Sequence, residues 1–366
     1  MQPKRFLQRS VRILLALLLA LIVYLYIIFP NIEKDLRKAP KNMRTDLWQT
    51  SRPDSLGCYF IENGATPSVA DFLAQTEDSI FVVNYRESHR SSVTLRDPEK
   101  FFVHFTNHYS VKTLNSYSAF LETGNGAYLK LFMKNAAWMR DHLTVLQDTA
   151  AVWTNDNMIY DKYKLSFGWP SAYAQGHGLS VLCRAFQSTR DSSYLAAAEK
   201  VLNSYNLDYR AGGILDVDSA GGYWYLEYPA DPPAYVLNGF IYGLFGIYDY
   251  WRLTGSPKAL RYFERGVATL AKNLHRYDKG YWSAYDLLYK QYCAGYNYHR
   301  NFHIPQLNVL YQLTGNPAFH EYEEKFRKYL GEPYFTVFKI KFSLDAVSRR
   351  FSYKNPIKQL SKEHLH

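Results

Sequence analysis

Four segments of similar composition decide the fold: Glu122-Thr-Gly-Asn-Gly-Ala-Tyr-Leu129, Ser188-Thr-Arg-Asp-Ser-Ser-Tyr-Leu195, Leu253-Thr-Gly-Ser-Pro-Lys-Ala-Leu260 and Leu313-Thr-Gly-Asn-Pro-Ala-Phe319. Their threonines stand at positions 123, 189, 254 and 314, so the spacings are 66, 65 and 60 residues. Each segment has a Gly or polar residue that ends a helix, then a polar residue before a Pro or small residue that begins one. Each is therefore predicted to be the tip of a helical hairpin, and the hairpins to form a repeat.

The residues that flank these turns have helical periodicity. Residues 127–139 place apolar side chains at helical spacing, and residues 236–250 are apolar nearly all round, which is typical of a buried helix. Four hairpins of about eight helices predict a mainly α fold. We expect an α/α toroid, in which an inner ring of more buried helices is surrounded by an outer ring.

Three long connections, at about 149–170, 207–231 and 276–296, join the hairpins at the end opposite the short turns. Long loops on a helical scaffold are uncommon unless they carry function. These loops also concentrate Gly, Trp and Tyr. The sequence therefore predicts the functional site at this end of the helices.

The chain divides into four predicted regions. Residues 1–30 are a cytoplasmic tail and signal anchor, and residues 31–105 are a linker with a small irregular or β-rich segment. Residues 106–331 are the toroid. Residues 332–366 are a basic C-terminal extension, which we expect to pack on the toroid with a basic outer face.

An apolar stretch near the N-terminus predicts membrane attachment. The uncharged run Ile13–Phe29 has 17 residues, follows four basic residues and is at the short end of what spans a bilayer. It ends in large residues rather than a small-residue cleavage site, which favours an uncleaved transmembrane anchor over a removed signal peptide. The preceding positive charge predicts a cytoplasmic N-terminus. The catalytic domain would then face the periplasm or a secretory lumen, Golgi-like in a eukaryote.

Composition narrows the class of protein and its partner. Among 366 residues, 47% are hydrophobic and 21% charged, which excludes a disordered chain, and 33 are tyrosines, an excess typical of aromatic grooves that hold sugars. The net charge of +10 suits an anionic partner. No nucleic-acid-binding motif accompanies it, so an acidic polysaccharide or a membrane surface fits better than nucleic acid. Cys58, Cys183 and Cys293 have neither disulfide nor metal spacing.

The loops carry residues that could transfer protons. Glu227 follows a dense run of rings after Gly221 and Gly222. A carboxylate among rings has a raised pKa, which suits acid/base work, although a surface acid beside a structural aromatic patch is the alternative. In the first loop, Gly176 and Gly178 are expected to allow close helix packing, or else to flank polar groups at a pocket mouth.

Two histidines of the third loop have a spacing that could suit a metal ion. His299 and His303 are four residues apart, so on a helix they share a face and could bind a metal ion. No third ligand has a suitable spacing. The sequence therefore predicts neither a metal nor another cofactor.

Several motifs together resemble the C-terminal helical domain of the D-glucuronyl C5-epimerases that act on heparosan-type polysaccharide. They are Ala172-Tyr-Ala-Gln-Gly-His177, Glu227-Tyr-Pro229, Tyr235-Val-Leu-Asn-Gly-Phe240, Tyr285-Asp-Leu287 and Tyr298-His-Arg-Asn-Phe-His-Ile-Pro-Gln-Leu307. The resemblance covers about residues 106–331. It implies a catalytic toroid, a homodimer, and conversion of D-glucuronate to L-iduronate within a polymer without a redox cofactor.

The resemblance also implies roles for individual residues. Glu227 and Tyr298 would be the acid/base pair on opposite faces of the sugar, with Tyr228 and Tyr285 as donors to the carboxylate or the intermediate. A phenol is a poor base unless its charge is stabilised, so Tyr298 would need a cation such as His299 or Arg300. The residues expected to bind substrate are Gln175, His177, Asn238, His299, Arg300, His303 and Gln306.

This chain departs from the resembled pattern in two places. The family has an Arg three residues after the tyrosine of the Tyr-Asp-Leu motif, where this chain has Leu288, and Lys290, Arg300 and Arg210 are the candidate substitutes. The family's β-rich N-terminal part is mostly missing. Two other classes therefore stay open: a polysaccharide lyase or glycoside hydrolase on the same kind of toroid, and a non-catalytic acidic-glycan-binding protein.

Overall fold

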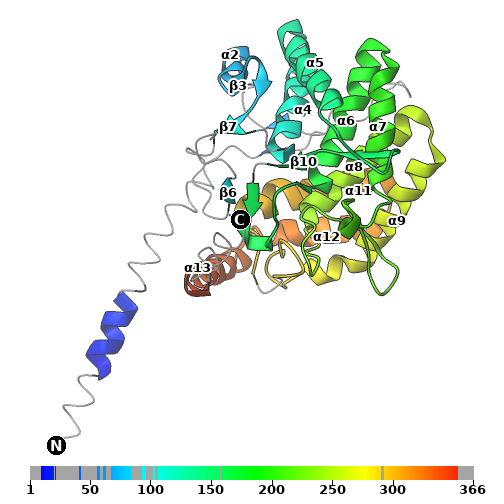
Figure 1. The fold of residues 1–366 in the computed structure, drawn as a ribbon. Coiled ribbons are helices and arrows are strands. Elements are labelled where there is room, and N and C mark those ends of the chain that lie inside the picture. The colour runs from blue at the N-terminus through cyan, green and yellow to red at the C-terminus, as the bar shows by residue number, and fades with distance from the viewer. Residues whose placement is uncertain are drawn as a thin grey trace, which may run out of the picture.

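The computed structural model of the chain is mainly helical, which confirms the predicted mainly α class (Figure 1). It describes residues 10–19, 21, 41–42, 56–57, 61–62, 67–84, 93–95, 102–103, 106–156, 158–289 and 292–352. Within these residues the helices dominate the region from Thr106 onward. The strands there are short and occur in two-stranded pairs.

The four predicted hairpins are confirmed. Each consists of two helices that pack against each other across a short turn. The pairs are α4 (Thr106–Thr123) with α5 (Gly126–Asp141), α6 (Ala172–Thr189) with α7 (Ser192–Ser204), α8 (Leu237–Thr254) with α9 (Pro257–Asn273), and α11 (Ile304–Thr314) with α12 (Pro317–Lys328).

One turn geometry recurs in all four hairpins. In each, the threonine hydroxyl accepts a hydrogen bond of 3.2 Å from the backbone N–H two residues later, which begins the next helix. The residue between them has a positive φ angle. Three turns use Gly there, because Gly adopts this conformation without steric cost, whereas the second turn uses Arg190 at φ 61°.

Helices α6 and α8 approach each other backbone to backbone. A Cβ on Gly176 would lie 2.1 Å from the carbonyl oxygen of Tyr242, and one on Gly246 would lie 2.2 Å from that of Gly176. Gly178 faces the ring of Trp153 in the same way, at 2.0 Å. The close-packing interpretation of Gly176 and Gly178 is therefore confirmed.

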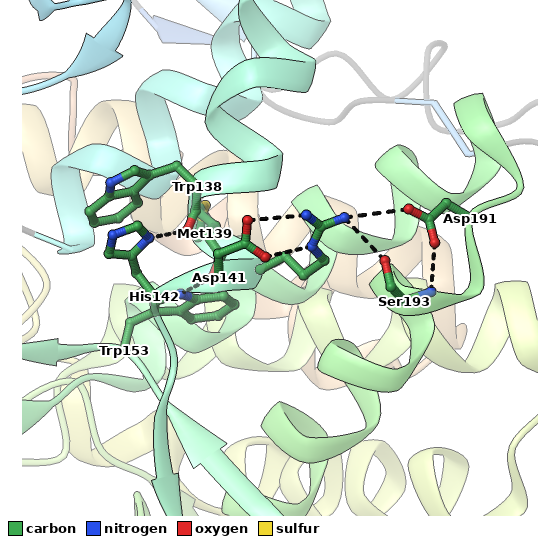
Figure 2. A network of polar contacts seen from close by, with 8 residues as sticks. Trp138, Met139, Asp141, His142, Trp153, Asp191 and Ser193 are labelled. Carbon is green, nitrogen blue, oxygen red and sulfur yellow. Dashed lines mark hydrogen bonds and ion pairs between the residues drawn. The ribbon is translucent and has the colours of Figure 1, made fainter.

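Contacts between helices run from α4 to α6, from α6 to α8, and from α8 to the π-helix η4 (His299–His303). Polar contacts also join helices α5 and α7 (Figure 2). Arg140 of α5 donates hydrogen bonds to Asp141 at 2.7 Å, to Ser193 at 3.1 Å and to Asp191 at 3.4 Å, the last two at the start of α7. The first two hairpins are therefore in contact through α5 and α7.

A buried ion pair joins helices α6 and α8 near the short turns. Arg184 of α6 contacts Asp249 of α8 at 2.5 Å, and both side chains are at most 1% exposed. The guanidinium also donates to the carbonyl oxygen of Gly57 at 3.0 Å. The segment before the hairpins therefore reaches into the helical core.

The long connections carry short strands and 3₁₀ turns. The first contains β8 (Thr144–Leu146), β9 (Ala150–Val152), β10 (Thr154–Asn155), β11 (Met158–Tyr160), η1 (Asp161–Tyr163) and β12 (Trp169–Pro170). The second contains η2 (Tyr209–Ala211) and the hairpin of β13 (Leu215–Val217) with β14 (Tyr223–Tyr225), and the third contains η3 (Leu274–Tyr277) and α10 (Tyr296–Tyr298).

The described residues before 106 include several short strands. These are β1 (Lys41–Asn42), β2 (Ile61–Glu62), β3 (Thr76–Glu77), β4 (Ile80–Phe81), β5 (Val83–Asn84), β6 (Val93–Leu95) and β7 (Phe102–Val103), with helix α2 (Val69–Leu73). Strand β6 pairs antiparallel with β11, with Val93 opposite Tyr160. This segment is thereby connected to the first long loop.

The two ends of the chain contain further helical residues. Residues 10–19 are helical, and much of the predicted anchor, residues 22–29, lies outside the described residues. Among the residues with a described structure, no helix is both long and apolar enough to cross a membrane. At the other end, α13 (Tyr334–Ser352) packs Phe338, which is fully buried, against Trp282 of the third loop with ring centroids 3.9 Å apart.

Candidate active site

The three long loops bring a cluster of tyrosines together. Tyr163 of the first loop stacks on Tyr228 of the second at a centroid distance of 4.6 Å, and Tyr160 lies 4.8 Å from the same ring. Tyr285 of the third loop meets Tyr298 edge to face at 4.8 Å. This set, which we call the tyrosine cluster, contains three of the four residues predicted to be catalytic.

Glu227, the fourth, lies beside the cluster at the start of helix α8. Its side chain is 3% exposed, and its Oε2 atom has no hydrogen-bond partner. Gly239, in the first turn of α8, packs so closely that a Cβ there would lie 2.2 Å from Oε2. The helix has no side-chain cap from its own N-cap residue, Val236, so the carboxylate lies where a helix end favours negative charge.

The pKa of Glu227 is raised to about 7, chiefly because burial penalises the charged form. Hydrogen bonds from the Tyr228 hydroxyl and the Gly239 backbone N–H oppose this shift, as does the positive charge of Lys162. A carboxyl group with a pKa near 7 can both accept and donate a proton near neutral pH. The chemistry expected from the sequence is therefore available at this residue.

The tyrosines of the cluster differ in solvent exposure. Tyr228 is 8% exposed and hydrogen-bonds with Tyr285, while Tyr298 is 38% exposed. Burial and the neighbouring Glu227 raise the pKa of both Tyr228 and Tyr285 well above that of a free phenol. These two phenols consequently stay protonated and can donate hydrogen bonds to an anion.

Lys162 is a site residue that sequence reasoning missed. Its ammonium lies 4.5 Å from the ring centroid of Tyr163 and 4.8 Å from that of Tyr285, and it forms an ion pair with Asp286 at 3.2 Å. The available signal was the sequence Tyr160-Asp-Lys-Tyr163, a cation between two tyrosines in the first long loop. Only the fold brings that loop to Tyr285.

Two residues predicted to bind substrate are engaged with the protein instead. The amide of Gln175 hydrogen-bonds in both directions with the backbone of Trp153, at 3.1 and 3.0 Å, and the residue is fully buried. His177 is also fully buried, with Nδ1 2.9 Å from the carbonyl oxygen of Tyr173. Burial lowers the pKa of His177 to about 4, which keeps it neutral.

His299 differs from the expectation that it supplies a cation to Tyr298. It is fully buried and stacks on Trp282 at 3.7 Å, with Nδ1 2.8 Å from the Ser283 hydroxyl and Nε2 2.9 Å from the carbonyl oxygen of Phe326. Burial lowers its pKa to about 3, so it carries no charge near neutral pH. The structure corrects this assignment, because a histidine held in an aromatic core cannot stabilise a phenolate by charge.

Three further residues that were predicted to bind substrate are buried in the helical core. His303, on η4, approaches the Ser283 hydroxyl at 2.7 Å through Nδ1, and Gln306 donates to the backbone oxygen of Asn238 at 2.9 Å. His303, Gln306 and Asn238 are at most 2% exposed, and each has one polar side-chain atom without a hydrogen-bond partner. A π-helix such as η4 is often found at functional sites.

The candidate replacements for the family Arg lie in different places. Arg300 contacts the ring of Tyr296 at 5.8 Å, and Arg210 pairs with Asp208 at 3.6 Å and with Asp216 at 3.8 Å. Lys290 lies outside the described residues. Leu288 itself packs against the tyrosine cluster. Lys162, which was not among these candidates, is the cation whose contacts with the cluster the structure records.

Comparison with known proteins gives an independent indication of function. Residues 147–328 match the family model described as the D-glucuronyl C5-epimerase C-terminus. The match begins in the first long loop and ends with helix α12, so it includes Glu227 and every residue of the tyrosine cluster.

Two relatives are similar to the chain over part of its length. An uncharacterized protein of Methanocaldococcus jannaschii is 33% identical over 183 residues, which are 49% of this chain and 58% of that protein. A D-glucuronyl C5-epimerase of Caenorhabditis elegans is 39% identical over 138 residues, 34% of this chain and 22% of that enzyme. The aligned part of the chain thus spans less than two thirds of either relative.

Proposed function

Because the chain belongs, through residues 147–328, to the D-glucuronyl C5-epimerase C-terminal family, we propose that it is a uronyl C5-epimerase. Its proposed reaction converts D-glucuronate to L-iduronate residues within an acidic polysaccharide. The observation that carries this proposal is the buried Glu227, whose pKa of about 7 suits proton transfer beside a cluster of phenols.

The chemistry needs two proton carriers on opposite faces of one sugar. Breaking the C5–H bond leaves an electron pair that moves into the adjacent carboxylate, and a proton is then added to C5 from the other face. Glu227 takes the inner face, where it is 3% exposed, and Tyr298 takes the outer face, where it is 38% exposed. Tyr228, which is buried, and Tyr285, which is partly buried, stay protonated and donate hydrogen bonds to the carboxylate as it gains charge.

We extend the proposal to architecture, location and partners. The contacts from α4 through α6 and α8 to η4 support an α/α toroid with α5, α7 and α9 outside. The apolar run Ile13–Phe29 after basic residues supports a membrane anchor, with the catalytic domain in the periplasm or a secretory lumen. The net charge of +10 supports an anionic polymer as substrate, and the family supports a homodimer.

Solvent exchange at C5 tests the proposed reaction. The full chain is incubated with glucuronate polymers in deuterated water, and NMR follows deuterium at C5 and the appearance of iduronate. The expected result is label and iduronate without chain cleavage, with loss of both in Glu227→Gln and in Tyr298→Phe. Exchange at the wild-type rate in both variants would overturn the site assignment.

The same experiment separates the alternatives. A lyase shares the first step but cleaves the chain, so an unsaturated uronate that absorbs ultraviolet light would replace iduronate. A glycoside hydrolase would cleave the chain without label at C5. A non-catalytic glycan-binding protein would bind the polymer and leave C5 unlabelled.

A further inference from the structure

The ammonium group of Lys162 lies near three aromatic rings, two from the tyrosine cluster and that of Tyr289. The distances from Nζ to the ring centroids of Tyr163, Tyr285 and Tyr289 are 4.5, 4.8 and 5.6 Å. The same nitrogen donates a hydrogen bond of 2.7 Å to the Tyr163 hydroxyl. A cation over the faces of several rings is favoured by their quadrupoles, more strongly where water is partly excluded.

Asp286 fixes this lysine in place. Its carboxylate is 2% exposed, pairs with Lys162 at 3.2 Å and accepts a hydrogen bond of 2.7 Å from the Tyr163 hydroxyl. The Tyr289 hydroxyl also donates to the backbone oxygen of Lys162 at 3.1 Å. The first and third loops are therefore joined by bonds that determine where the ammonium group lies.

The two charges of the pair differ in accessibility. The Lys162 side chain is 25% exposed, whereas that of Asp286 is 2% exposed. A ligand that approaches from solvent would therefore meet the positive partner. The charge of Lys162 also reaches Glu227, whose proton affinity it lowers, so the ammonium acts on both the cluster and the proposed base.

We propose that Lys162 binds the carboxylate of the uronate and balances the charge that this carboxylate gains when C5 loses its proton. This inference rests on the proposed function. When the C5–H bond breaks, the proton goes to the base and the electron pair moves into the carboxylate, which becomes doubly negative. An ammonium held beside it stabilises that charge, and the charge disappears again when a proton is added to C5.

The test compares Lys162→Met, which keeps an apolar stem over the rings, with Lys162→Arg, which keeps the charge. The matched control is Lys164→Gln, which removes the same charge from an exposed position two residues away. Two quantities are measured on the full chain: the kcat/KM for deuterium exchange at C5 of a heparosan-type polymer, and the affinity for that polymer and for the same polymer with its carboxyl groups reduced to alcohols.

Lys162→Met should lower kcat/KM roughly 10- to 100-fold, which is the loss of one charge-assisted hydrogen bond. It should also weaken binding of the acidic polymer but not of the reduced one, a difference that a merely structural defect would not produce. Lys162→Arg should stay within about tenfold of the wild type, and Lys164→Gln within about twofold. Equal behaviour of Lys162→Met and Lys164→Gln would overturn the inference.

Its failure can be distinguished from failure of the proposed function. If the wild type exchanges C5 and Lys162→Met does so equally well, the epimerase proposal stands and the role of Lys162 falls. If the wild type does not exchange the proton at C5, the epimerase proposal falls. The role of Lys162 in binding the carboxylate is then judged by whether Lys162→Met loses the preference for the acidic polymer over the reduced one. Should Lys162→Met not fold, a loss of that preference in Lys162→Arg, which keeps the charge, would overturn the role of charge.

Discussion

The helical core buries charge in two different ways at its two ends. Near the short turns, Arg184 and Asp249 form an ion pair at 2.5 Å with both side chains at most 1% exposed. Near the long loops, Glu227 is 3% exposed and has an oxygen without a hydrogen-bond partner. Asp249 also has one oxygen without a hydrogen-bond partner, so the two ends differ in the cation that meets the carboxylate. Direct contact with a guanidinium fixes the charge of Asp249 and holds two helices together, whereas Glu227, which forms no ion pair with the described residues, can gain and lose a proton.

The largest expected effect is at the loop end. Glu227→Gln should lower kcat for deuterium exchange at C5 by about 10²- to 10⁴-fold, since this is what a general acid or base contributes. The matched control is Asp231→Asn, an exposed acid four residues away in the same loop, which should retain activity within about twofold. Equal losses in both variants would mean that the loop, rather than this carboxyl group, was disturbed.

The turn end should show its effect in stability. Arg184→Met leaves Asp249 buried without its partner, and we expect a loss of about 3 to 5 kcal/mol in the free energy of unfolding. Urea unfolding followed by circular dichroism measures this value. Replacing both residues together, as Arg184→Met with Asp249→Leu, should recover much of the loss. A single variant as stable as the wild type would show that the pair does not hold α6 and α8 together.

The two ends also differ in how pH should act. The pKa of Glu227 is about 7 in the folded state and 4.5 for an ordinary glutamate, so the folded state binds the proton more tightly. The stabilising contribution is complete below pH 4.5 and is lost as pH rises to about 7, on the order of 3 kcal/mol. Unfolding of the wild type and of Glu227→Gln across this range should show the loss only in the wild type.

The same group should shape the activity profile. If Glu227 removes the C5 proton, kcat/KM should rise tenfold per pH unit below about pH 7 and level off above it, because only the deprotonated form acts as a base. The control is Asp231→Asn, which should give the same profile. A profile that levels off near pH 4.5 would show that another group is the base.

The smallest expected effect tests the repeated turns. Arg190 has φ 61° where the other three turns have Gly, and a residue with a Cβ is strained in this conformation. Arg190→Gly should therefore raise the free energy of unfolding by up to about 1 kcal/mol, measured by thermal unfolding. Gly255→Ala should lower it by a similar amount, although a Cβ there meets no atom within 4 Å. A common turn geometry is supported if the free energy of unfolding rises in Arg190→Gly and falls in Gly255→Ala.

The sequence allowed prediction of those features that depend on local chemistry. The four turns were predictable because helix ends require particular residues within a few positions, and the structure contains all four hairpins. Close packing at Gly176 and Gly178 was predictable because a residue without a side chain lets other groups approach its backbone, although their partners, Tyr242 and Trp153, come from other segments. In the loops, Glu227 was identified as a candidate by the dense rings around it, and the structure places it against the tyrosine cluster.

The roles of other site residues depended on contacts between distant segments. His299 was expected to be a cation, but the aromatic core formed by Trp282 and Phe326 makes it neutral. The sequence places His299 next to Tyr298, but it does not show that Trp282 and Phe326 pack around the imidazole. The pairing of Lys162 with Asp286 was missed likewise, because the two residues are 124 positions apart in the chain.

The sequence by itself determined the helical hairpins, the long loops between them and the concentration of rings and acids in those loops, because periodicity, capping and turn chemistry act over a few residues. Only the tertiary structure decided which charges are compensated. It paired Arg184 with Asp249, buried Glu227 without an ion pair to any described residue and placed Lys162 among the tyrosines. The physical reason is that proton affinity and ion pairing depend on burial and on neighbours in space, which a chain acquires only when its segments meet.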